Sequence, residues 1–259
     1  MVSERPTENA EHAAAIAPTR RRVAGVVEVA RALDHELPVQ CVLLPRIHAT
    51  PEAEEIAARA AELGIDVQRP GVRKFQRLQG QHADAAILAL VGPTPDADLD
   101  ATLARGGVVW LLTGPAYPGN VGFAIRIAEV SGADGLYVDN DFDHAKRREA
   151  QRTSMRADRF MPVGWEPAGL VIDAARRAGK RVIGIEDVGT CAPWDEDLTG
   201  PLLLVVGGEA EGIPPAVLTR CDAVVRIPMA GFVASYNLQA AVAAVASERL
   251  RQLERERRR

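Results

Sequence analysis

The sequence predicts an α/β protein built on a parallel sheet, and three observations lead to this fold class. Short apolar runs recur along the chain, and the run LLLVVGG at residues 202–208 has the continuous apolar character of a central parallel strand. Segments with helical apolar spacing separate these runs. A stretch rich in Pro and Asp, residues 93–107, divides the chain in two. Strands that alternate with helices predict a parallel sheet with helices on both faces.

Four segments follow from these observations. Residues 1–22 are rich in Ala, Glu and Pro, show no periodicity, and are expected to form a flexible arm. Residues 23–92 are expected to form a small α/β unit, and residues 93–107 have the composition of a linker. Residues 108–259 carry most of the strand–helix alternation and form the larger unit.

The small unit is predicted to begin with a helix, because Val26, Val29 and Leu33 lie on one helical face. A second helix is expected between Pro51 and Gly64, since Pro favours the first helical position and Gly follows helix ends. The other predicted elements are strands at residues 39–44, 65–68 and 83–91 and a short helix at residues 72–79.

The larger unit is predicted to alternate throughout between strands and helices. Its strands are expected at residues 108–114, 135–139, 160–163, 181–186, 202–208 and 223–229. Its helices are expected at residues 119–130, 144–155, 167–179 and 214–219 and from Asn237 onward. Ligands of open parallel sheets bind beyond the carboxyl ends of the strands, so we expect a site in the loops that follow them.

Composition limits the function classes. The chain has 259 residues, 47% hydrophobic and 25% charged, as in ordinary globular proteins. Its formal net charge of −4 argues against a strongly basic nucleic-acid binder but leaves room for local patches. There is no apolar run long enough for a membrane span or a signal peptide. Cys41, Cys191 and Cys221 lie far apart, which favours a reduced, cytoplasmic protein, and neither Cys nor His spacing predicts a metal site.

The first of three unusual loops is TGPAYPGNVGFAIR, residues 113–126. Asn120 is placed to cap the following helix, because its side-chain oxygen is able to accept from exposed N–H groups. Capping does not explain Arg126, a charged side chain within an apolar helix. One interpretation is an arginine whose stem packs while its head reaches solvent. The other is a functional cation.

The second and third loops follow the predicted strands at residues 202–208 and 223–229. In LLLVVGGEAEGIPP, two glycines allow close approach of the backbone to a ligand, and the acids Glu209 and Glu211 disfavour a phosphate. This loop matches neither the P-loop nor the dinucleotide fingerprint. In VRIPMAGFVASYNLQAAVAA, Ser235 and Asn237 are both good helix caps, and capping explains only one of them.

Together and in this order, the three loops resemble the motifs of the SPOUT superfamily, specifically the TrmH/SpoU family of RNA 2′-O-ribose methyltransferases. The likeness covers about residues 108–250. The matching residues are Asn120, Gly122 and Arg126 in N-x-G-x-x-x-R, Gly207, Glu209 and Gly212 in G-x-E-x-x-G, and Ile227, Pro228, Met229, Gly231, Ser235 and Asn237 in the third motif. Arg152 and Ser154 resemble the family's R-x-S stretch.

The resemblance implies a C-terminal domain with a trefoil knot, preceded by a small substrate-binding domain, and S-adenosylmethionine as cofactor. It implies a homodimer that acts on RNA, tRNA or rRNA, without a metal. The implied cofactor-binding residues are Gly207, Gly208, Gly212, Ile227, Met229 and Leu238. The implied catalytic residues are Arg126, Asn120, Glu209, Ser235 and Asn237. Expected RNA contacts are Arg152, Ser154 and Arg22.

By the same resemblance, Arg126 holds phosphate and activates the ribose hydroxyl by its charge, because a guanidinium rarely gives up its proton. Asn120 orients Arg126 or the substrate. Two positions depart from the family pattern: Tyr236 stands where Leu is usual, and Arg156 where Gly is usual. Two alternatives therefore stay open, methyl transfer to a small molecule and a non-catalytic RNA-binding member.

Overall fold

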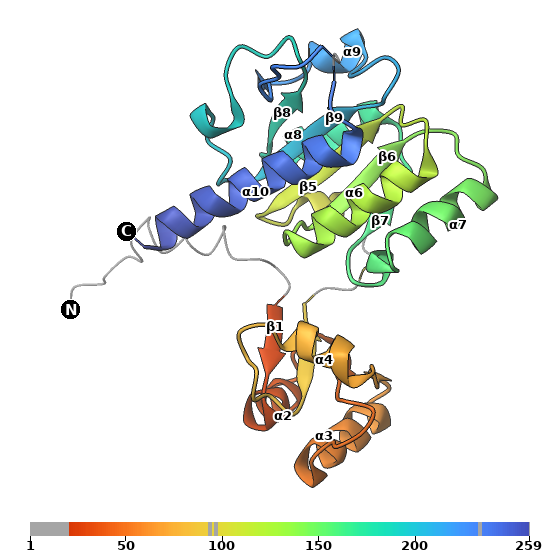
Figure 1. Ribbon diagram of the computed structural model, residues 1–259, viewed down its shortest axis with the longest axis vertical. Helices are drawn as coiled ribbons and strands as arrows, with labels where there is room; N and C mark the ends of the chain where they lie inside the picture. Colours follow the sequence, from red (N-terminus) through yellow and green to blue (C-terminus); the bar gives the residue numbers. More distant parts are fainter. Residues whose placement is uncertain (1–20, 93–94, 96–97, 233–234, 259) are drawn as a thin grey trace. The chain divides into compact units, whose positions relative to one another are not determined.

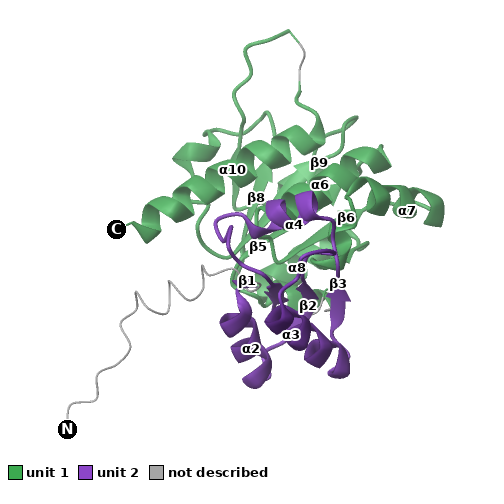
Figure 2. Ribbon diagram, turned by 60° about the horizontal axis from the view of Figure 1, so that its bottom comes forward, with its two compact units in different colours: residues 1–18, 95–259 green, residues 19–94 purple. Residues whose placement is uncertain are grey.

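The structure is a computed structural model that describes residues 21–92, 95, 98–232 and 235–258 (Figure 1). The chain divides into two compact units, a smaller one at residues 19–94 and a larger one that includes residues 95–259 (Figure 2). Of the arm expected at residues 1–22, only Arg21 and Arg22 lie within the described part. No helix of that part is both long enough and apolar enough to cross a membrane.

The smaller unit is a four-stranded sheet with the order β1-β4-β2-β3. Strands β2 and β3 are parallel, and β4 runs antiparallel to both of its neighbours. Apolar side chains of α2 and α3, among them Val29 and Ile56, pack with those of the sheet in a single core. The elements are β1 (Arg21–Ala24), α2 (Val26–Asp34), β2 (Val39–Leu43), α3 (Pro51–Glu62), β3 (Asp66–Gln68), α4 (Val72–Gln79) and β4 (Leu88–Val91).

The start of this unit differs from the prediction. The sequence placed Arg21 and Arg22 in the arm and began a helix at Val23, but these residues form β1, which pairs with β4. The helix starts later because Gly25, its N-cap, adopts a φ of 99°, a conformation that favours glycine. The turn at Gly25 separates strand from helix, which periodicity alone did not reveal.

The larger unit contains the predicted parallel sheet. All six strands are parallel, in the order β10-β8-β9-β5-β6-β7. The central strands are continuous apolar runs, and every residue of β5 is buried. The strands are β5 (Val108–Thr113), β6 (Gly135–Asp139), β7 (Val163–Gly164), β8 (Arg181–Ile185), β9 (Leu202–Gly207) and β10 (Ala223–Val225).

Helices cover both faces of this sheet, and each face has its own core. Side chains of α6, α7 and α10 pack against one face, and those of α8 against the other. Figure 1 shows α6 and α10 side by side across the first face. The helices are α5 (Leu99–Leu103), α6 (Pro118–Val130), α7 (His144–Thr153), α8 (Ala168–Arg177), α9 (Pro215–Leu218) and α10 (Leu238–Arg257), with 3-10 turns η1 (Ala157–Arg159) and η2 (Pro193–Asp195).

The expected linker at residues 93–107 is in part a helix of the larger unit. The Asp98 side chain accepts from the N–H of Ala101 at 2.7 Å and caps α5. Leu103 is fully buried in the core beneath α8. Two of the acids that gave this stretch its linker composition therefore belong to a helix: Asp98 caps α5, and Asp100 lies in its first turn.

A cluster of buried charges lies at the amino edge of this sheet, where β5, β6 and β8 begin. Lys180 is 3% exposed and Asp134 is 1% exposed. The Lys180 ammonium donates to the carbonyl oxygens of Arg105 and Gly107, each at 2.6 Å, and Asp134 Oδ2 accepts from the Gly107 N–H at 2.8 Å. Burial lowers the pKa of Lys180 from 10.5 to about 8, although Asp134 opposes that shift. Burial also lowers the pKa of Arg249 on α10.

Candidate functional site

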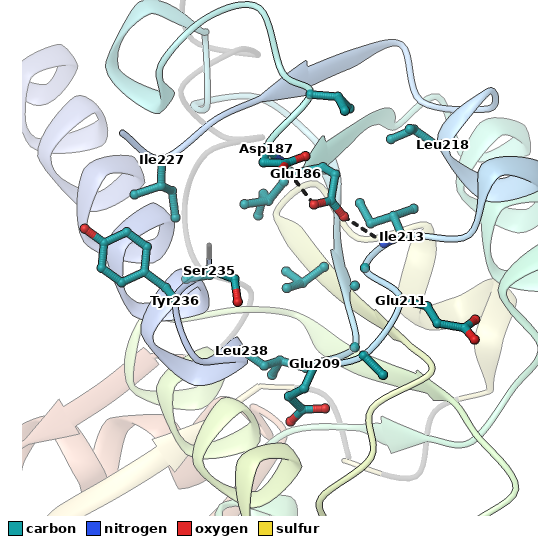
Figure 3. Close-up of a pocket in the computed structure, with 18 of the residues that line it drawn as sticks. Glu186, Asp187, Glu209, Glu211, Ile213, Leu218, Ile227, Ser235, Tyr236 and Leu238 are labelled. Carbon is teal, nitrogen blue, oxygen red and sulfur yellow. Dashed lines mark hydrogen bonds between the residues drawn. The ribbon is translucent and has the colours of Figure 1, made fainter. Parts of the chain in front are cut away.

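A pocket of about 430 Å³ opens at the carboxyl edge of the sheet, among the loops that follow β8, β9 and β10 (Figure 3). This is the edge at which the sequence predicted a site. The six residues that were expected to bind a cofactor all line this pocket: Gly207, Gly208, Gly212, Ile227, Met229 and Leu238. Their chemical role is not tested by their position and stays a prediction.

The loop after β9 has no space for side chains at its glycines. A Cβ at Gly207 would lie 2.0 Å from the carbonyl carbon of Gly212, and one at Gly208 would lie 2.1 Å from the carbonyl oxygen of Gly114. Gly212 has a φ of 65°, and its N–H donates to the carbonyl of Gly208 at 3.1 Å. The loop therefore folds tightly back on itself and presents backbone to the pocket.

Glu186 is a pocket residue that the sequence analysis missed. It follows β8 directly, and its carboxylate accepts from the N–H groups of Ile213 at 2.8 Å and Asp187 at 3.1 Å. Figure 3 shows its side chain reaching toward Ile213, while Glu209 and Glu211 extend away from the centre of the pocket. It thereby joins the loops after β8 and β9. An acid directly after a buried strand was the signal that could have identified it.

Asn120 contacts Glu209 and is not the helix cap that the sequence predicted. Helix α6 begins at Pro118 with Tyr117 as its N-cap, and Asn120 lies inside the first turn. Its side-chain amide donates to Glu209 Oε1 at 2.5 Å, and the Ala116 N–H donates to Glu209 Oε2 at 2.8 Å. Both oxygens of Glu209 are thus held, one by the loop before α6 and the other by the first turn of α6.

Arg126 lies on the exposed face of α6 and does not line the pocket. Phe123 and Val130 on the same helix are 45% and 74% exposed. Among the described residues no hydrogen bond or ion pair involves the Arg126 guanidinium. The structure thus leaves its head in solvent beside two exposed apolar side chains.

Ser235 and Asn237 stand at the start of α10, at the pocket and beside it respectively. Ser235 lines the pocket, whereas Asn237 occupies the N-cap position without a side-chain capping bond. The capping expected from these two side chains is therefore not observed at Asn237. Tyr236 also lines the pocket, and its hydroxyl donates to the carbonyl of Pro228 at 3.4 Å.

The three residues expected to contact RNA differ in their surroundings. Arg152 is exposed on α7. Ser154 is fully buried at the end of α7, and its hydroxyl donates to the carbonyl of Gln151 at 2.7 Å. Its role as an RNA contact stays a prediction. Arg22 belongs to the smaller unit, where it is exposed and donates to the carbonyl of Gln79 at 3.3 Å.

The pocket combines carboxylates with apolar walls. Among the described residues its lining includes Glu186 and Asp187 but no Lys or Arg, together with the side chains of Val206, Ile213 and Leu238. This disfavours a phosphate and suits a ligand with a flat apolar part, hydroxyls and positive charge. No group of three His, Cys, Asp or Glu suitable for a metal ion occurs among residues 21–92, 95, 98–232 and 235–258.

The family model of the SpoU rRNA methylase family matches residues 107–247. A 23S rRNA (uridine(2479)-2′-O)-methyltransferase from Streptomyces viridochromogenes is 31% identical over 242 residues, which cover 89% of this chain and 82% of that protein. A 23S rRNA (guanosine-2′-O-)-methyltransferase from Xanthomonas axonopodis pv. citri is 28% identical and covers 89% of this chain and 96% of its own length.

A solved structure agrees with these matches. The SpoU methyltransferase AviRb from Streptomyces viridochromogenes, in complex with the cofactor AdoMet, aligns with a TM-score of 0.56 at 28% identity, over 96% of this chain and 98% of that one. An AdoMet-bound rRNA methyltransferase from Sinorhizobium meliloti aligns with a TM-score of 0.57 at 21% identity and supports the fold alone.

Proposed function

The chain belongs to the SpoU rRNA methylase family, and we propose that this S-adenosylmethionine-dependent RNA 2′-O-methyltransferase acts on 23S ribosomal RNA. The observation that carries the proposal is the pocket at the carboxyl edge, which the second and third motif loops line, in a chain that aligns over 89% of its length with 23S rRNA methyltransferases. The free thiols of Cys41, Cys191 and Cys221 are in keeping with a cytoplasmic enzyme.

The residues of the pocket fit S-adenosylmethionine, which supplies an electrophilic methyl group on a positively charged sulfur. The tight loop at Gly207, Gly208 and Gly212 has no side chains at these positions and lets the backbone approach an adenosine edge. Ile227 and Leu238 offer apolar walls for the ring. The Glu186 carboxylate adds a negative field that favours a cation.

We assign Arg126 to the RNA phosphate beside the reacting ribose. A guanidinium binds phosphate through paired N–H donors, and its charge lowers the pKa of a nearby 2′-hydroxyl without accepting its proton. Glu209 acts as a positioning residue, because Asn120 and the Ala116 N–H hold both of its oxygens at the mouth of the pocket. Ser235 and Asn237 follow at the start of α10, where they are exposed to an incoming sugar.

We also propose a homodimer that uses the exposed face of α6. Phe123 and Val130 place apolar surface in solvent on either side of Arg126. A second copy would bury that surface. It would also bring Arg126 to the pocket of the second copy, since Arg126 does not line the pocket of its own chain. Light scattering should give twice the chain mass, and Val130→Glu should lower both the mass and the activity. A fully active monomer would refute this assembly.

The smaller unit is proposed to bind RNA. Arg73, Lys74 and Arg77 are exposed on α4, a helix without an acidic residue, and Arg22 reaches the end of that helix through the Gln79 carbonyl. Among the described residues no ion pair neutralises these four cations. A local basic surface of this kind suits the phosphate backbone, although the whole chain is acidic.

The test is methyl transfer from labelled S-adenosylmethionine to purified 23S rRNA, 16S rRNA and tRNA in parallel. We expect a 2′-O-methyl nucleoside in 23S rRNA alone. Arg126→Ala should reduce the rate by about 100-fold or more while cofactor binding by calorimetry changes little, since a lost transition-state contact of this kind typically has that effect. Label that enters tRNA instead would overturn the rRNA assignment. Label only in small molecules of a nuclease-treated lysate would favour the alternative substrate class.

A further inference from the structure

The segment from His144 to Arg159 is strongly basic in a protein that is acidic overall. It carries six Lys or Arg residues against two acids, whereas the whole chain has a formal net charge of −4. The segment spans α7, the turn after it and η1. Four of its arginines are exposed and spaced at three or four residues, which we call the α7 surface: Arg148, Arg152, Arg156 and Arg159.

The cations of the α7 surface have no partners in the part of the chain that the structure describes. None of their side chains forms a hydrogen bond or an ion pair there. Several other arginines of the larger unit are paired: Arg176 with Asp222, Arg177 with Asp100, Arg181 with Glu196, Arg220 with Asp173 and Arg251 with Glu248. The α7 surface therefore keeps its full positive charge for an external anion.

Backbone strain marks the centre of this surface. Met155 and Arg156 have φ values of 57° and 64°, in the left-handed region that costs a non-glycine residue about 1 kcal/mol or more. The turn is held in place because the Arg156 N–H donates to the carbonyl of Gln151 at 3.2 Å and Ser154 is buried beneath it. A glycine would adopt this conformation freely, so the arginine stands here at a cost in stability.

The α7 surface adjoins the helix that carries Asn120 and Arg126. A Cβ at Gly122 of α6 would lie 2.5 Å from the carbonyl oxygen of Ala150 and 3.0 Å from the backbone nitrogen of Ser154. The end of α7 therefore contacts α6 one turn before Arg126. Figure 2 shows α6 and α7 adjacent in the larger unit, as in Figure 1. Both neighbouring helices carry an exposed arginine, Arg126 on α6 and Arg152 near the end of α7.

We propose that the α7 surface is a second RNA-binding surface, which holds phosphates next to the ribose at Arg126. The proposal rests on the proposed function and deepens it, because it assigns the backbone contacts to named residues of the larger unit. Phosphate contacts fix register without reading sequence, and planar guanidinium groups are well suited to them. Arg156, where a glycine is the residue expected from the resemblance, would give this chain one phosphate contact more.

The main experiment compares two full-length variants with the same loss of charge. The first is Arg148→Gln/Arg156→Gln/Arg159→Gln, which leaves Arg152 in place. The second is Arg176→Gln/Arg177→Gln/Arg181→Gln, whose arginines are exposed but paired. A fluorescein-labelled RNA stem-loop is titrated by anisotropy over a series of KCl concentrations. Calorimetry with S-adenosylmethionine verifies that both variants keep their pocket.

We expect the first variant to bind RNA at least tenfold more weakly at low salt, while the second differs from the wild type by less than about twofold. The slope of log Kd against log [KCl] should fall by about 2 in the first variant, since each phosphate contact contributes about 0.7 to 0.9. Equal weakening in both variants would overturn the proposal. Because binding is measured without methyl transfer, a missing methylated product would refute the proposed function and not this surface.

A single substitution separates binding from stability. Arg156→Gly removes one cation and relieves the strained backbone, so we expect weaker RNA binding together with a higher melting temperature. Arg156→Lys should retain most of the affinity without the gain in melting temperature. A glycine variant that binds RNA as tightly as the wild type would show that Arg156 does not contact phosphate and would overturn its part in the surface.

Discussion

At the carboxyl edge of the six-stranded sheet charged residues line a pocket, whereas at the amino edge charged side chains are buried. Glu186 and Glu209 are partly exposed and hold loops through backbone N–H groups and Asn120. Asp134 and Lys180 are almost fully buried and bond to the backbone where strands begin. One edge is thus arranged for a ligand and the other for stability, although both use the same kinds of residue.

The largest effect on stability is expected at the amino edge. Asp134→Ala removes the negative charge between Lys180 and Arg249 and leaves two buried cations uncompensated, which costs about 3–5 kcal/mol in comparable sites. Urea denaturation followed by circular dichroism measures this loss. Asp134→Asn, which keeps an acceptor for the Gly107 N–H, should lose less. If Asp134→Ala unfolds within about 1 kcal/mol of the wild type, the amino edge does not hold the fold as described.

The second effect is a dependence of stability on pH. The pKa of Lys180 is lowered from 10.5 to about 8 in the folded protein, so between these values the unfolded chain binds the extra proton. Stability should therefore rise as pH increases through that range, by about 3 kcal/mol from this residue. The neutral amine still donates to the carbonyls of Arg105 and Gly107.

The matched variant is Lys180→Met, which fills the same space without a titrating group. The difference in unfolding free energy between wild type and variant, measured at several pH values, isolates this contribution. We expect the wild type to gain on the variant as pH rises above about 8. A difference that stays constant with pH would contradict the buried state of this amine.

The third effect is expected to be larger on cofactor binding than on stability. Glu186→Gln replaces one of two acceptors by a donor that faces the N–H of Ile213 or Asp187. Because the loops then lose one charge-assisted hydrogen bond, of about 1.5–3 kcal/mol, we expect about tenfold weaker binding of S-adenosylmethionine by calorimetry. The melting temperature should change much less than in Asp134→Ala. Unchanged cofactor affinity would remove Glu186 from the pocket's function.

Sequence reasoning identified the fold of the larger unit because its signals are strong and local. The apolar runs that become β5 and β9 are buried on both faces, which leaves few alternatives to a central parallel strand. Boundaries were harder to predict. Gly25 separates a strand from a helix within one apolar pattern, and Asp98 caps a helix inside a segment with linker composition.

For the site, the residue types at strand ends predicted where the pocket lies. Contacts between loops that are distant in sequence could not be predicted from local pattern. The resemblance placed Asn120 and Glu209 in one site, whereas the local pattern predicted Asn120 as a helix cap. In the structure its amide donates to Glu209, which lies 89 positions further along the sequence. Ser154 matches the family pattern that predicted an RNA contact, but in the structure it is buried at the end of α7. Glu186 has no motif around it, and only the fold brings Ile213 to its carboxylate.

The smallest effect concerns an exposed ion pair of the larger unit. Arg177 donates to Asp100 at 2.7 Å, but the two side chains are 62% and 73% exposed. Because water screens such a pair, Arg177→Gln should change the unfolding free energy by less than about 0.5 kcal/mol, against several for Asp134→Ala. The same denaturation series measures both variants. A loss of more than about 1 kcal/mol at Arg177 would mean that exposure does not separate the two kinds of charge. It would also mean that Arg177→Gln is not a suitable part of the control variant in the RNA-binding experiment on the α7 surface.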